Sequence, residues 1–198
     1  GFLDNLREQV RHHDAPVATI TYYAHWLLQQ HVKDHGYRIS VSGTAADELF
    51  AGYYDHHNAY LSMVHGDEAL FAESLKNWQT HILPEVRNPH LSNPRLFIDN
   101  PNHRDHIYLN NEEFAQYLKA DWFEPYAETT YCDDLLRNRM LNELFHEATP
   151  VILHEDDLNA MYHSIENRSP FLDRSLFEFA FSIPTHHLIR GGFNKSVL

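Results

Sequence analysis

The chain has few of the residues on which several classes of protein depend. Its 198 residues include one cysteine, Cys132, so no disulfide can form within the chain. No run approaches the roughly 18 consecutive apolar residues that a membrane-spanning helix needs. Basic side chains number 15 against 28 acidic ones, which gives a formal net charge of −13. These shortages favour a cytoplasmic protein that binds neither nucleic acid nor anionic membranes.

Histidine is abundant, but its spacing does not predict a metal site. Six of the 17 histidines form adjacent pairs: His12-His13, His56-His57 and His186-His187. Adjacent residues on a helix point in different directions, and the sequence contains neither a Cys-x-x-Cys nor a His-Glu-x-x-His spacing. A Gly-x-Ser-x-Gly turn is also absent, so a serine hydrolase has no support.

Helical periodicity dominates the chain. Apolar residues recur at helical spacing from Val17 to His35, Gly36 ends that segment, and Tyr37 to Ser42 forms one clear strand. Four prolines between Pro84 and Pro101 predict an irregular segment. Thr149-Pro150 is expected to end a helix. By residue number, we predict helices over 17–35, 46–64, 111–119, 133–148, 156–164 and 173–182.

The stretch after this strand is the most informative part of the sequence. Small residues, Ser42-Gly43-Thr44-Ala45-Ala46, lead into Asp47-Glu48 at the start of a predicted helix. Backbone N–H groups of small residues can approach an anion closely, and a carboxylate can hold the Mg²⁺ that accompanies phosphates. The pattern also fits an ordinary strand-to-helix turn with Asp47 as a first-turn acid.

Four segments together resemble one known family. Ser42-Gly43-x-x-x-Asp47-Glu48-Leu49-Phe50-x-Gly52-Tyr53 resembles the second nucleotide motif in the synthetase domain of glutamine-hydrolysing asparagine synthetases. Residues 161–173 resemble a later signature of that domain, and Arg190-Gly191-Gly192-Phe193-Asn194-Lys195 resembles its glycine-plus-lysine segment. His13-Asp14-Ala15-Pro16 is similar to the family's His-Asp-Glu-Pro. The order and spacing of the four segments fit the family.

The resemblance implies an α/β parent fold of the adenine nucleotide alpha hydrolase type, a parallel sheet flanked by helices. Residues 1–198 would be a partial synthetase domain, predominantly helical with few strands. They lack the family's Ser-Gly-Gly-x-Asp-Ser pyrophosphate loop and its N-terminal glutaminase domain. We therefore expect a fragment of a longer protein that is inactive in isolation, and we expect its exposed sheet edge and apolar faces to promote self-association.

The activity that the resemblance implies is that of a carbon–nitrogen ligase, asparagine synthase (glutamine-hydrolysing). Its substrates would be ATP, a carboxylate such as aspartate, and ammonia from glutamine supplied by the absent domain. The cofactors would be ATP and Mg²⁺. Ser42 and Gly43 would contact the adenylate, Asp47 would bind Mg²⁺ and pyrophosphate, and Lys195 would neutralise the developing phosphate charge.

Two departures from the family pattern bear on the acceptor. Thr44 stands where asparagine synthetases commonly have an acid that assists at the aspartyl-adenylate, and threonine has no base near neutral pH. Ala15 replaces the acid of His-Asp-Glu-Pro. Thr44 also favours an alternative reading, a noncatalytic binding or assembly module that retains the synthetase fold.

Several acidic residues are weaker candidates for the site. Glu48 would support the phosphate site or favour the helix start. Asp157, Glu166 and Asp173 lie in the segment that shapes the region around the family's active site, where Arg168 is expected to hold a carboxylate in a buried ion pair. Asp14 falls in a stretch that borders the nucleotide and acceptor pocket.

Overall fold

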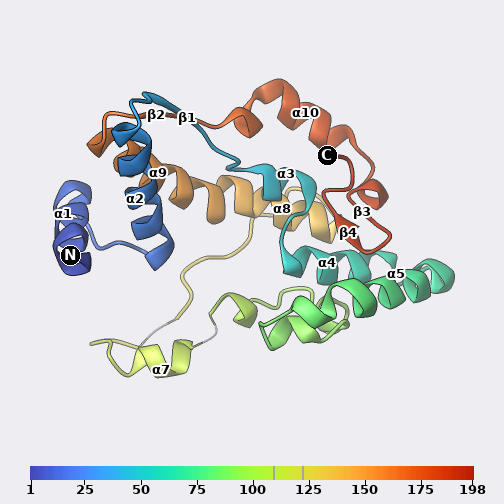
Figure 1. Ribbon diagram of the computed structural model, residues 1–198. Helices are drawn as coiled ribbons and strands as arrows, with labels where there is room; N and C mark the ends of the chain where they lie inside the picture. The colour runs from blue at the N-terminus through green and yellow to red at the C-terminus, as the bar shows by residue number, and fades with distance from the viewer. Residues whose placement is uncertain (109, 122) are drawn as a thin grey trace. The chain divides into compact units, whose positions relative to one another are not determined.

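The computed structural model describes residues 1–108, 110–121 and 123–198. Most of the described residues lie in helices, with four short strands among them, which confirms the expected helix-rich chain (Figure 1). The chain divides into two compact units, Gly1–Ala46 with Glu143–Phe179 (unit 1) and Asp47–Asn142 with Ala180–Leu198 (unit 2). Three helices have residues in both units: α3 (Ala46–Phe50), α8 (Leu135–Phe145) and α10 (Arg174–Ser182).

Unit 1 is a helical layer with one strand pair. Its other elements are α1 (Phe2–His13), α2 (Ile20–Asp34), β1 (Ile39–Val41), α9 (Ala148–Tyr162), β2 (Glu166–Arg168) and the 3₁₀ turn η4 (Pro170–Leu172). β1 and β2 pair in parallel, with Ile39 opposite Glu166 and Val41 opposite Arg168. The Ile39 and Val41 side chains are exposed. The parallel sheet of the parent fold and self-association both remain predictions.

A buried polar cluster joins the three long helices of unit 1. The Gln9 side-chain amide donates to Asn159 Oδ1 at 2.9 Å and to the Tyr22 carbonyl at 3.0 Å. Asn159 Nδ2 donates to the same carbonyl at 3.1 Å. Beside the cluster, the Trp26 and Tyr162 rings lie 4.0 Å apart. This cluster fixes α1, which periodicity did not predict, against α2 and α9.

Unit 2 contains most of the short elements. They are α4 (Tyr54–Val64), α5 (Glu68–His81), η1 (Leu83–Glu85), η2 (His90–Ser92), α6 (Leu96–Asp99), η3 (Asp105–Ile107), α7 (Asn111–Ala115), η5 (Thr185–His187), β3 (Ile189–Arg190) and β4 (Phe193–Asn194). β3 and β4 pair antiparallel. The main apolar core of this unit is formed by Ala51, Ala59, Tyr60, Val64, Leu91, Leu96, Phe97, Leu136, Met140, Leu188 and Ile189. The segment around Pro84–Pro101 is irregular as predicted. The apolar side chains that it contributes to this core pack it against α4.

Two predicted helix boundaries are wrong for identifiable reasons. The helix predicted over 46–64 is divided into α3 and α4, because Ala51 adopts a left-handed conformation (φ 56°) and the Gly52 N–H bonds back to the Asp47 carbonyl at 2.8 Å. Thr149-Pro150 does not end a helix. Pro150 lies in the first turn of α9. Backbone N–H groups in a first turn have no intrahelical acceptor, so the missing N–H group of proline is tolerated there.

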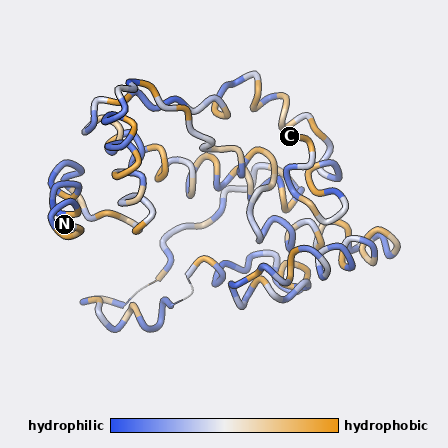
Figure 2. Tube along the Cα trace, in the orientation of Figure 1, coloured by the Kyte–Doolittle hydropathy of each residue, from blue (hydrophilic) through white to orange (hydrophobic). Residues whose placement is uncertain are grey.

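The other predicted elements are found with shifted bounds. The structure places α2, β1, α8 and α10 inside the predicted segments, and α7 is shorter than its segment. The helix predicted over 156–164 is the second half of α9. Among the described residues, no helix is long and apolar enough to cross a membrane. Figure 2 shows hydrophobic and hydrophilic residues alternating along the helices.

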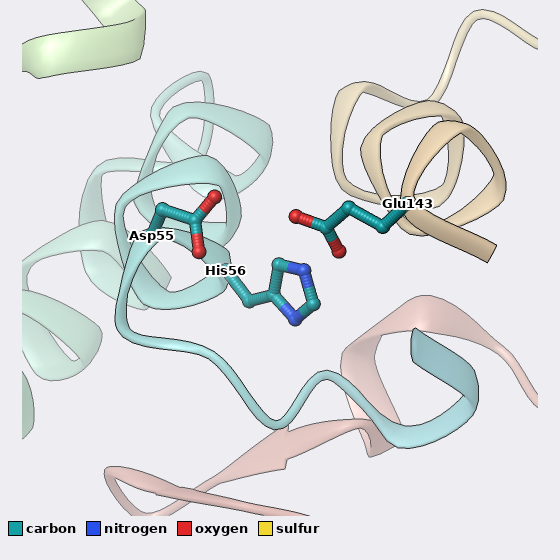
Figure 3. Close-up of side chains that lie close together, drawn as sticks. All are labelled: Asp55, His56 and Glu143. Atoms are coloured by element: carbon teal, nitrogen blue, oxygen red, sulfur yellow. The ribbon is translucent and has the colours of Figure 1, made fainter. Parts of the chain in front are cut away.

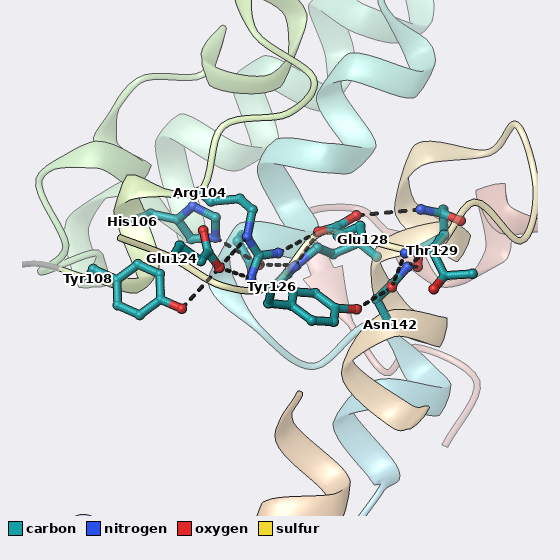
Figure 4. A network of polar contacts seen from close by, with 11 residues as sticks. Arg104, His106, Tyr108, Glu124, Tyr126, Glu128, Thr129 and Asn142 are labelled. Atoms are coloured by element: carbon teal, nitrogen blue, oxygen red, sulfur yellow. Dashed lines mark hydrogen bonds and ion pairs between the residues drawn. The ribbon is translucent and has the colours of Figure 1, made fainter. Parts of the chain in front are cut away.

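An ion-pair network holds a stretch of unit 2 that has no helix or strand of its own, residues 123–132 (Figure 4). Arg104 lies 2.6 Å from Glu124 and 2.9 Å from Glu128. The Tyr108 hydroxyl donates to Glu124 at 3.0 Å, and Arg139 of α8 also pairs with Glu128. Only 14% of the Arg104 side chain is exposed. The charges in this network are therefore screened little by solvent.

Asn142 holds the same stretch through neutral hydrogen bonds. Its Oδ1 accepts from the Thr129 N–H at 2.8 Å and from the Tyr126 hydroxyl, and its Nδ2 donates to the Thr129 carbonyl at 2.8 Å. The Arg104 guanidinium lies over the Tyr126 ring, 5.0 Å from its centre. Side chains thus satisfy backbone groups that a helix or strand would otherwise pair.

We predict that Arg104→Met lowers the free energy of unfolding by about 2–4 kcal/mol, because it leaves Glu124 without its cation in a largely buried position. Urea unfolding at pH 7 measures the change. Arg95→Met is the matched control, because Arg95 makes an exposed ion pair with Asp99 whose loss costs at most about 1 kcal/mol. Equal losses in the two variants would contradict the assigned role of the network.

Acid should remove the difference between wild type and Arg104→Met. Burial opposes ionisation of Glu124, but its hydrogen bonds with Arg104 and Tyr108 lower its pKa overall. A carboxyl group with a lowered pKa stabilises the fold at neutral pH, and this contribution is lost as the pH falls below 4.5. We therefore expect the two unfolding free energies to converge below that pH.

Candidate functional site

The loop after β1 carries the first group of predicted residues. Its backbone continues the strand pairing, because the Ser42 N–H donates to the Arg168 carbonyl at 2.8 Å. The Ser42 hydroxyl lies 3.0 Å from Thr44 Oγ1 and 3.0 Å from Ser169 Oγ. The Gly43 carbonyl accepts from the Ala46 N–H at 3.1 Å. Hydrogen bonds of the Ser42 hydroxyl thus help to fix the conformation of the loop. Thr44 contributes a hydrogen-bonding group to it rather than a base.

The structure brings together the two residues to which the sequence assigned the phosphate chemistry. Lys195 Nζ lies 2.6 Å from Asp47 Oδ1 in unit 2. The two side chains are 37% and 34% exposed, respectively. Periodicity gave no indication of this contact, because Lys195 comes from the C-terminal hairpin and Asp47 from the first turn of α3.

Gly52 makes room for this ion pair. A Cβ atom at Gly52 would lie 1.6 Å from Asp47 Oδ1 and 2.5 Å from Lys195 Cε. Both distances are far below van der Waals contact, so any other residue here would displace the two charged groups. The ion pair therefore packs directly against the backbone between α3 and α4.

The hairpin of β3 and β4 brings Lys195 to Asp47. Gly191 and Gly192 form its two-residue turn with φ values of 59° and 87°, a conformation that suits glycine and the twist of a tight hairpin. Asn194 Nδ2 donates to the Gly52 carbonyl at 2.8 Å. The Lys195 N–H donates to the Phe50 carbonyl at 3.2 Å. These two bonds anchor the end of the hairpin to the turn after α3.

Glu48 does not share the exposed position of Asp47. Its side chain is buried and accepts a hydrogen bond from the Tyr53 hydroxyl at 2.7 Å. The motif therefore divides into two roles, with Asp47 at the surface beside a cation and Glu48 tied to the residue that precedes α4. Tyr53, Gly52 and Asn194 are the neighbours that sequence reasoning did not assign, although all three stand within the quoted motifs.

The remaining candidates lie in unit 1 and do not form one cluster. Asp14 ends α1 in a left-handed conformation (φ 52°), and Asp157 is exposed on α9. Asp173 Oδ1 accepts from the Ser175 and Leu176 N–H groups, so it caps α10. Glu166 pairs with Arg168 at 2.8 Å, but both side chains are more than half exposed. The expected burial of this ion pair is therefore wrong, because the β1–β2 pair leaves this face open.

Acidic and histidine side chains at the start of α4 form a separate group. Figure 3 shows Asp55 and His56 in the first turn of that helix. The Asp55 carboxylate lies 3.4 Å from His106 Nε2 and 3.4 Å from Arg139 Nε. Burial opposes ionisation of Asp55, but His106, His56 and Arg139 lower its pKa. Asp55 thus lies beside the Arg139 cation and belongs to the charge network of unit 2.

Comparison with known proteins identifies the family to which this chain belongs. A family model described as "Asparagine synthase" matches residues 1–198. The chain belongs to the asparagine synthase family. This confirms the resemblance that the four segments indicated.

Comparison with one curated member of the family shows how much of that protein this chain covers. The chain is 28% identical over 204 residues to "Asparagine synthetase [glutamine-hydrolyzing] 3" of Bacillus subtilis (strain 168). The match covers 99% of this chain and 28% of that relative, so the chain spans less than a third of the relative's length. No solved structure matches the chain significantly.

Gly52→Ala should separate Asp47 from Lys195. The added methyl group occupies the position of Asp47 Oδ1, so we expect the carboxylate to rotate away and the unfolding free energy to fall by about 1–3 kcal/mol. A crystal structure of the variant gives the Lys195–Asp47 distance, and urea unfolding gives the stability.

Gly66→Ala is the control for this substitution, because a Cβ at Gly66 meets nothing within 4 Å. We expect its stability to stay within about 1 kcal/mol of wild type. An intact 2.6 Å ion pair in Gly52→Ala would contradict the assigned role of Gly52.

Proposed function

We propose that this chain is part of the synthetase domain of an ATP-dependent, glutamine-dependent amidotransferase, in which Asp47 and Lys195 serve the phosphate side of the reaction. The observation that carries the proposal is their ion pair beside Gly52. Membership of the asparagine synthase family supports the reaction class. Aspartate is the proposed acceptor, in agreement with the name of the Bacillus subtilis relative.

The Asp47 side chain suits a magnesium ion that is shared with phosphates. Magnesium in such sites takes one or two protein carboxylates and completes its coordination with water and phosphate oxygens. Lys195 reaches Asp47 Oδ1, and no hydrogen bond or ion pair with another described residue reaches Oδ2. Glu48 is buried beside Tyr53, so Asp47 is the carboxylate of this motif that faces solvent. When bound, the metal would neutralise charge on the pyrophosphate.

Lys195 is proposed to stabilise negative charge on the transferring and leaving phosphates. An ion pair that is about one-third exposed contributes at most about 1 kcal/mol, so its rupture costs little. A triphosphate carries more negative charge than one carboxylate and would compete well for the ammonium group. In this view Asp47 holds Lys195 in position before the nucleotide binds.

The proposed reaction has two steps. A carboxylate oxygen of the acceptor attacks the α-phosphorus of ATP, a P–O bond forms, and the bond to the β-phosphate breaks to release pyrophosphate. Ammonia then attacks the acyl carbon of the acyl-adenylate, the bond to AMP breaks, and one proton is released. Negative charge accumulates on phosphate oxygens in the first step, where a fixed cation stabilises the transition state.

Thr44 bears on the second step and on the alternative function. Its hydroxyl is hydrogen-bonded to Ser42 and has no basic form near neutral pH. An enzyme with threonine here needs another group, or the released phosphate, to accept the proton. The alternative proposal, a noncatalytic binding or assembly module, leaves the arrangement of Asp47, Gly52 and Lys195 without a chemical use.

Exchange of labelled pyrophosphate into ATP by the full-length protein tests the proposal. We expect exchange that requires aspartate and Mg²⁺, and we expect Lys195→Ala and Asp47→Asn each to reduce it by about 10²–10³-fold, the usual effect of removing one group that stabilises transition-state charge. Lys76→Ala and Asp133→Asn, at exposed positions outside the motif, are the matched controls and should exchange at the wild-type rate.

Each result of this assay decides between the proposals. Exchange with a different carboxylate, but not with aspartate, would retain the enzyme and overturn the acceptor. No exchange with any carboxylate tried would favour the noncatalytic module. Exchange that survives both substitutions at Asp47 and Lys195 would overturn the phosphate site.

A further inference from the structure

A cavity of about 240 Å³ lies in unit 2, apart from the Asp47–Lys195 pair. Its walls come from α4, from α5, from η5 and from the hairpin of β3 and β4. A cavity of about 150 Å³ can hold benzene, so this one has room for a ligand the size of an amino acid. Among the sequence motifs, only the Arg190–Gly192 part of the glycine-plus-lysine segment touches it.

Trp78, one of the residues that line the cavity, carries a buried hydrogen-bond donor without an acceptor. Trp78 lines the cavity and is 2% exposed, and its indole Nε1–H has no hydrogen-bond partner among the described residues. A buried donor that loses water without gaining a partner costs about 1–3 kcal/mol. A ligand acceptor that reaches this donor after a small adjustment of the side chain would remove this cost.

His57 adds a second polar group to the lining. It is 3% exposed. Burial, together with the neighbouring His56, lowers the His57 pKa to about 4, although Asp55 acts in the opposite direction. The imidazole is therefore neutral at pH 7 and offers one donor and one acceptor. The inner wall thus contributes hydrogen-bonding groups without a net charge.

Two opposite charges border the same cavity. Glu73 on α5 and Arg190 on β3 both line it and are both exposed. Neither forms an ion pair with any residue that the structure describes. Apolar side chains of Leu61, Leu70 and Ile189 form part of the remaining surface, which also includes the polar residues Ser74, Asn77 and His186. The lining residues therefore include one cation, one anion, a tryptophan with an unsatisfied donor, and an apolar surface.

We propose that this cavity binds a free α-amino acid with an apolar side chain. Its carboxylate would pair with Arg190 and accept from the Trp78 indole, and its ammonium group would pair with Glu73. The side chain would pack against Leu61 and Ile189. The charges of a zwitterion match the two ions of the cavity, whereas an anion or a cation alone would leave one of them unpaired.

Calorimetry with L-leucine on the full-length protein tests the proposal, with two analogues that each lack one charge. These are 4-methylpentanoate, without the ammonium group, and 3-methylbutylamine, without the carboxylate. We expect saturable binding of leucine with a Kd of about 1 mM or tighter, and at least tenfold weaker binding of each analogue. Because leucine is not the proposed substrate, this result is independent of the exchange assay.

Variants assign the binding to this cavity. Arg190→Gln and Glu73→Gln should each weaken leucine binding at least tenfold, and Trp78→Phe, which removes the N–H group, at least threefold. Glu85→Gln and Arg87→Gln, exposed charges outside the cavity, are matched controls. Circular dichroism checks that each variant is folded. If Trp78→Phe does not fold, the Arg190 and Glu73 variants still test the proposal, because exposed positions tolerate substitution.

Three results would overturn the proposal. The first is the absence of saturable leucine binding at about 10 mM, ten times the expected upper limit of the Kd. The second is binding that both charge substitutions leave unchanged. The third is equal binding of leucine and 4-methylpentanoate, which would identify a site for apolar acids in which Glu73 has no role.

Discussion

The ion pair between Lys195 and Asp47 exists because position 52 carries no side chain. A single Cβ there would occupy the space of the carboxylate oxygen and press on the lysine stem. The turn between α3 and α4 brings Gly52 to this place, since Ala51 is left-handed and the Gly52 N–H bonds to the Asp47 carbonyl. The same short segment, Ala51-Gly52, therefore determines both the backbone turn and the placement of the two charges.

The strength of the pair also matters for the proposed chemistry. Exposed ion pairs contribute little to stability, so this one is better understood as a means of holding a cation in place. Other contacts share in this positioning: a tight glycine turn, the Asn194 side chain and the Lys195 backbone fix the end of the hairpin. On a chain with a net charge of −13, such an anchored cation would give the proposed nucleotide a specific place to bind.

Local patterns in the sequence predicted the helices with one clear apolar face, such as α2, and the short strand before Ser42. They failed where a backbone conformation decided the outcome. The side chain of Ala51 does not predict a left-handed backbone conformation, and Pro150 is compatible with either end of a helix. The polar cluster around Asn159 and the network around Arg104 depend on contacts between distant segments, which periodicity does not reveal.

The candidate site was predictable to a different degree. The motif resemblance singled out Asp47 and Lys195, which the structure places 2.6 Å apart, but their roles remain proposals. Glu48 and Asp173 also belong to the motifs that resemble the family, yet one is buried beside Tyr53 and the other caps α10. A motif specifies residue types, whereas burial and hydrogen-bond partners decide which carboxylate faces solvent.

The most direct test of the central claim is calorimetric titration of the full-length protein with ATP in the presence and absence of Mg²⁺. We predict magnesium-dependent binding that Asp47→Asn and Lys195→Ala each weaken at least tenfold, because each removes one charged group from the phosphate site. Binding that is independent of Mg²⁺ and unchanged in both variants would contradict the assignment of this ion pair to ATP.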